Sequence, residues 1–216
     1  FTHITHEIRT PVTLILAPVE EIMRQKNIPE EIRDDLEVVK RNSERLLDLV
    51  NQILDFTKAE QEAFSSQNTW FDIDDLVEKT VQRFTPAAQQ KGIQLSHDTP
   101  QPIRICTDRE ALTKVLSNLL TNAMKFTKDR ILVSLTENPE AHTVTISVED
   151  NGTGIKPTEK EKIFNLFYQS ANKPQLPNKG FGIGLAIVSL LVKRMMGKIE
   201  VESEENRFTR FRITLP

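Results

Sequence analysis

The chain has 216 residues, 38% hydrophobic and 27% charged, which is long enough to bury a core in one large or two small domains. Its formal net charge of -3 argues against a general nucleic-acid-binding protein, and its apolar runs are too short to cross a bilayer. The single cysteine, Cys106, excludes an internal disulfide and fits a reducing compartment, and we expect it to pack in the core.

Residues 1–62 contain no glycine and carry apolar residues at alternating intervals of four and three. The spacing predicts two helices with a shared heptad seam, joined by a tight turn in which Pro29 starts the second helix. The seam positions are Ile8, Val12, Ile15, Val19 and Ile22, then Ile32, Leu36, Val39, Ser43, Leu46, Val50, Ile53 and Thr57.

A lone helical hairpin of this size buries too little apolar surface to be stable. We therefore expect an all-α hairpin that dimerises into a four-helix bundle. An intramolecular coiled-coil spacer is the alternative that the spacing leaves open. The sequence begins inside this amphipathic pattern and shows no signal peptide, so we expect it to be a piece of a longer protein.

The opening stretch FTHITHEIRTP places a histidine, an acid and a proline on the first helix. Helical geometry points His6 away from the apolar seam, with Thr10 one turn later on the same face. Pro11 has no amide hydrogen, so the carbonyl of Glu7 loses its helical partner and we expect a bend just after His6. His3 is close enough to His6 for a shared metal ion, but no third ligand is evident.

The polar segment Ala63–Thr69 is typical of a linker, and we expect one domain over residues 1–65 and another over residues 66–216. The second domain should hold three helices, over residues 72–92, 108–127 and 182–197. Asp72 and Asp108 are the expected caps, and Gly92 and Gly197 the expected stops. Strand pairs are expected over residues 130–137 with 143–150, and 198–203 with 209–216. This order predicts an α+β sandwich with a mostly antiparallel sheet and helices on one face.

Five of the seven glycines fall in two clusters. DNGTGI, with Gly152 and Gly154, follows an expected strand. GFGIGL, with Gly180, Gly182 and Gly184, opens an expected helix, whose N-terminal amides attract phosphate. Either cluster alone is also consistent with plain turns, and neither matches a Walker A loop or a dinucleotide fingerprint.

Asn118, Asn122 and Lys125 share one face of the second expected helix. Carboxamide oxygens can ligate Mg²⁺, and an ammonium can meet phosphate, although such a face is more often simply solvated. Two glycine loops in the same small domain favour a Mg²⁺-nucleotide site.

The segments HEIRTP, NLLTNAMKF, DNGTGI, IFNLFYQ and GFGIGLAIV resemble, in order and spacing, the signature boxes of bacterial sensor histidine kinases. The likeness covers nearly the whole chain. It implies a dimerisation and phosphoacceptor domain, followed by a catalytic ATP-binding domain of the fold shared with Hsp90, gyrase B and MutL.

The resemblance assigns roles to the first helix. It implies that His6 is phosphorylated and that Glu7 orients and activates the imidazole. It links Thr10 to dephosphorylation of a partner protein, through an oriented water.

In the second domain the resemblance implies ATP with Mg²⁺. Asn122 would hold the metal, Asn118 would support the site and Lys125 would lie near the phosphates. Asp150 would accept the adenine amino group. The clustered glycines would line the site: Gly152 and Gly154 would shape the adenine pocket, Gly180 would end the lid, and Gly182 and Gly184 would face the phosphates.

A mobile lid is also implied by the resemblance, from Tyr168 to Gly180, with Phe164 and Phe167 anchoring its start. Implied partners are a second copy of the chain and a response-regulator receiver domain, separate or in the same full-length chain. Neither nucleic acid nor direct membrane contact is expected of this segment. The implied location is the cytoplasmic side of a bacterial inner membrane, with the anchor in segments outside this sequence.

The implied activity is autophosphorylation of His6 from ATP, transfer of the phosphoryl group to a receiver aspartate, and phosphatase action on that receiver. A noncatalytic nucleotide-binding scaffold and an ATPase clamp of the Hsp90 or MutL kind are the alternatives. The intact His6, Glu7, Asn122 and Asp150 argue against the scaffold, and the heptad hairpin argues against the clamp.

Overall fold

The computed structural model describes residues 2–25, 27–61, 67–99, 102–170 and 180–216, with only the backbone of residues 2–7 and 61. The chain divides into two compact units, Phe1–Glu60 and Gln61–Pro216. The expected domain boundary between residues 65 and 66 lies outside the described residues.

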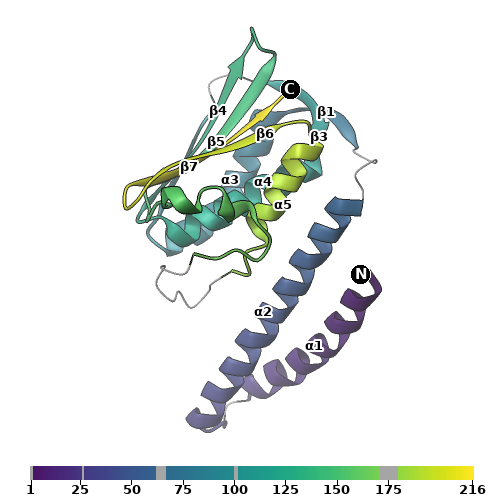
Figure 1. Ribbon diagram of the computed structural model, residues 1–216. Helices are drawn as coiled ribbons and strands as arrows, with labels where there is room; N and C mark the ends of the chain where they lie inside the picture. Colours follow the sequence, from purple (N-terminus) through teal and green to yellow (C-terminus); the bar gives the residue numbers. More distant parts are fainter. Residues whose placement is uncertain (1, 26, 62–66, 100–101, 171–179) are drawn as a thin grey trace. The chain divides into compact units, whose positions relative to one another are not determined.

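The first unit is a hairpin of two helices, α1 (Thr2–Met23) and α2 (Glu30–Gln61) (Figure 1). The amide of Arg33 donates to the carbonyl of Pro29 at 3.0 Å, so Pro29 stands at the start of α2 as expected. Arg9 Nη2 donates to Asn51 Oδ1 at 2.7 Å across the hairpin. This contact ties the first turns of α1 to the second half of α2.

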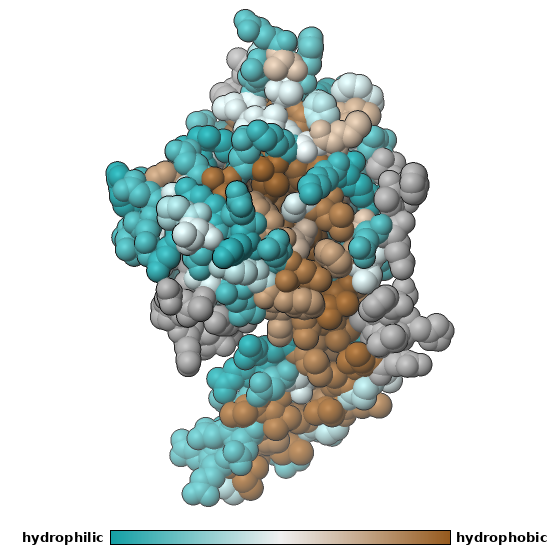
Figure 2. Space-filling model, viewed as in Figure 1, coloured by the Kyte–Doolittle hydropathy of each residue, from teal (hydrophilic) through white to brown (hydrophobic). Residues whose placement is uncertain are grey.

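The heptad seam of the hairpin is only half buried. Along α1 the exposure alternates, since Val12 and Val19 are 4% and 8% exposed while Ile15 between them is 49% exposed. Figure 2 shows apolar side chains gathered along the surface of the hairpin. The exposed seam residues are Ile8, Ile15, Ile22, Ile32, Val39 and Leu46. One set of positions closes the hairpin and the other is left for a second apolar surface.

The second unit is an α+β fold in which α3, α4 and α5 cover one face of a sheet (Figure 1). Its elements are β1 (Asn68–Asp72), α3 (Ile73–Gln90), β2 (Gln94–Asp98), β3 (Arg104–Asp108), α4 (Arg109–Phe126), β4 (Arg130–Asn138), β5 (Thr143–Asp150), α5 (Gly184–Arg194), β6 (Lys198–Glu204) and β7 (Phe208–Leu215). Two 3₁₀ turns, η1 (Pro157–Glu159) and η2 (Lys162–Phe164), lie between β5 and α5. The three expected helices and both expected strand pairs are confirmed.

The main sheet has the order β2-β4-β5-β7-β6. All its pairings are antiparallel except that of β2 with β4, and β1 pairs with β3 in a separate two-stranded sheet. The sequence reading missed β1, β2 and β3, because five-residue strands carry too few alternations to stand out. In β3, Ile105 and Thr107 point inward and Cys106 is exposed, so the expectation that Cys106 packs in the core was wrong.

The two expected caps behave differently. Asp108 Oδ1 accepts from the amide of Ala111 at 2.9 Å and caps α4. Asp72 occupies the N-cap position of α3 but makes no side-chain cap bond, and pairs instead with Arg104 at 3.5 Å. Asp72 therefore marks the start of α3 without satisfying its first amides.

Helix α4 carries the centre of the core. Leu112, Leu116 and Leu119 are at most 1% exposed and face the sheet side of the unit. Ile131, Ile146 and Ile213 of the neighbouring strands are fully buried. This packing holds the polar face of α4 outward, where the candidate site lies.

Candidate functional site

The first part of the site is the loop that follows β5. Asp150, the last residue of β5, is 5% exposed, and its Oδ1 accepts the amide of Gly152 at 2.9 Å. A buried carboxylate with two oxygens is well suited to accept a hydrogen bond from a ligand. Thr153 Oγ1 is buried in the same loop and finds no hydrogen-bond partner among the described residues.

The two glycines of this loop are required by neighbouring backbone. A Cβ on Gly152 would lie 1.9 Å from the carbonyl oxygen of Phe126. A Cβ on Gly154 would lie 2.2 Å from the carbonyl oxygen of Glu204. The close approach seen here is to the protein's own backbone. The expected role of both glycines in shaping an adenine pocket stays a prediction.

Asn151, between Asp150 and Gly152, has a structural role that the sequence reading missed. Its Oδ1 accepts from Thr127 Oγ1 at 2.9 Å and from the amide of Arg130 at 3.0 Å, while its Nδ2 donates to Asp129 Oδ1 at 2.7 Å. These bonds tie the loop to the turn between α4 and β4. An Asn after a strand-ending Asp is the only sequence signal for this role.

The polar face of α4 meets the second glycine cluster. A Cβ on Gly184 would lie 2.8 Å from Asn118 Oδ1, and one on Gly180 would lie 2.9 Å from Lys125 Nζ. The side-chain carboxamide of Asn122, one turn after Asn118, makes no hydrogen bond with the described residues. The structure thus brings together residues that the sequence placed on separate elements.

Helix α5 begins at Gly184, within the second cluster, and its N-cap residue Ile183 makes no side-chain cap bond. Its first amides therefore lack a side-chain acceptor, and the positive end of the helix dipole lies beside Asn118. This is the local chemistry of an anion site.

The two ends of the expected lid are held together. The amide of Phe167 donates to the carbonyl of Gly182 at 2.9 Å, and Gln169 Nε2 donates to the carbonyl of Gly180 at 2.9 Å. The body of the lid, residues 171–179, lies outside the described residues. The Tyr168 hydroxyl donates to Glu159 Oε1 at 3.1 Å, and desolvation, followed by this bond, raises the pKa of Tyr168 above its ordinary value.

The two phenylalanines expected to anchor the lid differ. Phe164 packs edge-on against Phe211, with ring centroids 6.4 Å apart. The Phe167 side chain is 57% exposed, and its residue has a φ of 63°. Phe164 is thus held through its ring and Phe167 through its backbone amide, and their role as lid anchors stays a prediction.

The other expected site residues lie on α1. His6 and Glu7 belong to the helix, but their side chains lie outside the described residues. Thr10 is exposed, as the expected outward face requires. The helix runs on through Pro11 and also through a second proline, Pro18.

The described part of the chain shows neither a cluster of candidate metal ligands nor a helix that could span a membrane. No three His, Cys, Asp or Glu side chains gather there in a way that could hold a metal ion. None of the described helices is both long and apolar enough to cross a membrane. The side chains of His3 and His6 are outside this description.

Comparison with known protein families matches both units. Residues 1–62 match the "His Kinase A (phospho-acceptor) domain", and residues 107–216 match the "Histidine kinase-, DNA gyrase B-, and HSP90-like ATPase" family.

Individual relatives agree with the family matches. The chain is 31% identical to "Sensor histidine kinase YcbM" of Bacillus subtilis, over 99% of this chain and 70% of that protein. It is 31% identical to "Autoinducer 2 sensor kinase/phosphatase LuxQ" of Vibrio parahaemolyticus, over 98% of this chain and 25% of that protein. The solved structure of full-length ShkA in complex with AMPPNP is 29% identical, with a TM-score of 0.83 over 100% of this chain and 45% of that one.

Proposed function

The chain belongs to the sensor histidine kinases, and on that premise we propose that it phosphorylates its own His6 from ATP bound at Asp150, Asn122 and the two glycine loops. The observation that carries the proposal is the convergence of Asn118 and Lys125 on the second glycine cluster, beside an uncapped helix N-terminus. Triphosphate recognition needs this combination of cation, amide donors and close backbone.

Recognition of the base falls to Asp150. One carboxylate oxygen accepts the Gly152 amide, which fixes the orientation of the carboxylate. A carboxylate can accept several hydrogen bonds at once, and the exocyclic amino group of adenine is a donor of the right kind. Guanine carries a carbonyl oxygen where adenine has this amino group, and the carboxylate of Asp150 would repel that oxygen. Asp150 would therefore select adenine over guanine.

Mg²⁺ would bind through Asn122, and its chemistry there is to neutralise charge on the phosphates. The fit is supported by a half-buried carboxamide that none of the described residues bonds. Asn118 already donates from Nδ2 to the carbonyl of Lys114 at 2.9 Å, so its Oδ1 is turned to the glycine side. Lys125 would place its ammonium near the same phosphates.

The transfer step needs a neutral imidazole, which is available because histidine has a pKa near 6.5. One ring nitrogen of His6 attacks the γ-phosphorus, and the bond from that phosphorus to the bridging oxygen of ADP breaks. Glu7 would accept a hydrogen bond from the other ring nitrogen and stabilise the cation that forms. The phosphoryl group would then pass to an aspartate of a receiver domain.

Thr10 lies one turn after His6 and is exposed. Its hydroxyl would orient a water against the phosphorylated receiver, giving the phosphatase reaction. A relative whose name includes both kinase and phosphatase supports this second activity.

The assembly would be a homodimer through the exposed seam of the hairpin, which is supported by the phosphoacceptor-domain match and by the exposed Ile15. The full-length protein would lie on the cytoplasmic side of a bacterial inner membrane, anchored by segments outside this sequence. Its receiver would be a separate protein or a further domain of the same chain.

The deciding experiment is labelling with γ-³²P ATP. The wild-type chain should gain an acid-labile, base-stable label. His6→Gln should abolish the label without loss of ATP binding, and His3→Gln on the same helix should keep it. Asp150→Asn should lose both label and ATP binding. An unlabelled wild-type chain that binds ATP would instead indicate a noncatalytic scaffold.

A further inference from the structure

A row of polar side chains crosses three strands beside the glycine loop. Asp150 of β5 lies opposite Thr209 of β7, and Thr209 lies opposite Ser203 of β6. Residues opposite each other in antiparallel strands point to the same face, here the face covered by the helices. Asp150 and Thr209 are each 5% exposed. Most other positions on this face are apolar, so three polar side chains in a row call for an explanation.

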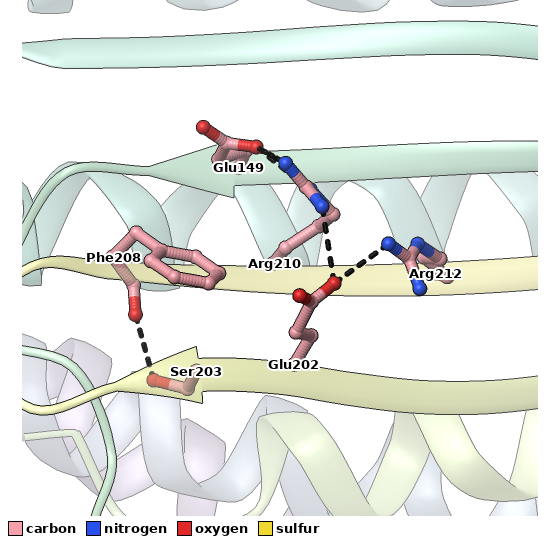
Figure 3. Close-up of polar contacts among 6 residues, drawn as sticks. All are labelled: Glu149, Glu202, Ser203, Phe208, Arg210 and Arg212. Atoms are coloured by element: carbon pink, nitrogen blue, oxygen red, sulfur yellow. Dashed lines mark hydrogen bonds and ion pairs between the residues drawn. The ribbon is translucent and has the colours of Figure 1, made fainter.

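The Ser203 hydroxyl connects this row to the loop. It accepts from the amide of Ile155 at 2.8 Å and donates to the carbonyl of Phe208 at 2.7 Å, the latter contact drawn in Figure 3. A hydroxyl has one hydrogen to donate. Thr209 Oγ1, at 3.3 Å, must therefore be the donor in its contact with Ser203. Ser203 thus has its one donor and both acceptor positions occupied.

The turn between β6 and β7 holds the same loop through its backbone. The amide of Asn206 donates to the carbonyl of Thr153 at 2.9 Å. Gly154 packs directly on the carbonyl of Glu204. Lys128 Nζ donates to the carbonyl of Asn206 at 3.1 Å, which joins the turn to the segment after α4.

The outer face of the same strands is fixed by charge. Arg210 of β7 donates to Glu149 of β5 at 2.7 Å and to Glu202 of β6 at 3.0 Å, and Arg212 donates to Glu202 at 2.6 Å (Figure 3). The hydrogen bond to Glu149 is the main cause that raises the pKa of Arg210. The network holds β5, β7 and β6 in register directly beneath the polar row.

We propose that Ser203 is a positioning residue for nucleotide recognition, which clamps the DNGTGI loop to the β6–β7 hairpin and so keeps Asp150 aligned with the base. This inference rests on the proposed function. Without the hydroxyl, the Ile155 amide loses its acceptor and Thr209 loses its bond, so the end of the loop after Asp150 is held less tightly. The side chain itself does not touch the nucleotide.

The test compares Ser203→Ala with Ser203→Thr, which restores a hydroxyl, and with Ser147→Ala, a serine on the opposite face of β5. Amide hydrogen exchange of residues 151–155 in the nucleotide-free chain should speed up about tenfold in Ser203→Ala only, because the Ile155 amide loses its part-buried hydrogen bond. The dissociation constant for ATP should rise about tenfold. The dissociation constant for GTP should rise less, so the preference of the site for ATP over GTP becomes smaller. The labelling rate at saturating ATP should stay near that of the wild-type chain.

Several outcomes would overturn the positioning role. The first is an unchanged rate of amide exchange in the loop of Ser203→Ala. The second is an equal loss of affinity for ATP and GTP in that variant. The third is a folded Ser203→Thr chain that does not recover the wild-type exchange rate and ATP affinity. Each of them leaves ATP binding by the wild-type chain intact. A wild-type chain that binds no adenine nucleotide would instead overturn the proposed function, and this role with it.

Discussion

At the residue scale, two glycines with nearly the same backbone angle serve different needs. Gly92 has a φ of +67°, and a Cβ added there would meet nothing within 4 Å, whereas Gly154 has a φ of +65° and lies against the carbonyl of Glu204. The first needs only the left-handed conformation after α3. The second needs that conformation and also the absence of a side chain.

We predict that Gly92→Ala lowers the free energy of unfolding by about 1 kcal/mol, the cost of the left-handed conformation alone. Gly154→Ala should cost about 1–3 kcal/mol more, because a methyl group must displace backbone, and it should also weaken ATP binding. Urea denaturation and calorimetry measure both effects. Equal costs for the two variants would contradict the packing explanation.

The two aspartates at helix starts form a second matched pair. We predict that Asp108→Ala destabilises the second unit by about 1 kcal/mol or more, since α4 loses its cap. Its ion pair with Arg194, at 3.7 Å and with both side chains under 15% exposed, is lost as well. Asp72→Ala should cost clearly less, because Asp72 makes no cap bond. Urea denaturation measures the free energy of unfolding of each variant. Similar losses in Asp108→Ala and Asp72→Ala would contradict the stabilising role of the Asp108 cap.

At the element scale, α1 holds two prolines in a helix that is nonetheless continuous from Thr2 to Met23 (Figure 1). Each proline removes one backbone hydrogen bond and crowds the carbonyl four residues earlier. For Pro11 that carbonyl belongs to Glu7, beside the proposed phosphoacceptor. For Pro18 it belongs to Leu14, two turns further on.

We predict that Pro11→Ala straightens α1 near His6 and changes the ratio of kinase to phosphatase activity, because His6 then meets its two partners from one fixed geometry. Pro18→Ala removes the same kind of defect away from His6 and should leave the ratio unchanged. The measurements are the rate of label gain on the chain and the rate of label loss from a phosphorylated receiver. An equal ratio in wild type and Pro11→Ala would contradict the idea that a bend at Pro11 lets His6 meet two partners.

At the scale of the whole molecule, the exposed half of the hairpin seam leaves the first unit incomplete. Val12 and Val19 close the hairpin while Ile8, Ile15 and Ile22 stay 38–49% exposed at the intervening positions. Burial of such a stripe against an identical one completes a bundle core. The second unit has its own core and does not need this contact.

We predict that Ile15→Glu converts the dimer to a monomer, since two carboxylates would be forced into an apolar seam. Arg41→Glu, on an exposed position outside the seam, should leave the dimer intact. Sedimentation equilibrium reports the mass, and the ATP dissociation constant of the second unit should stay the same. A dimeric Ile15→Glu chain would show that the exposed seam is not the interface.

Local patterns were enough to predict much of the molecule. The four-three spacing predicted the hairpin, the alternating strands predicted β4 with β5 and β6 with β7, and the glycine clusters marked both site loops. These features depend on residues close together in the chain, so periodicity and turn chemistry reveal them.

The remainder depends on contacts between distant segments, which only the tertiary structure decides. The parallel pairing of β2 with β4, the exposure of Cys106 and the row Asp150, Thr209 and Ser203 all follow from register across strands. The sequence by itself determined which residues are the candidates for the chemistry, because type and local spacing are written in the chain. Tertiary packing decided what holds them in place, because a backbone carbonyl such as that of Glu204 has no signature in the sequence.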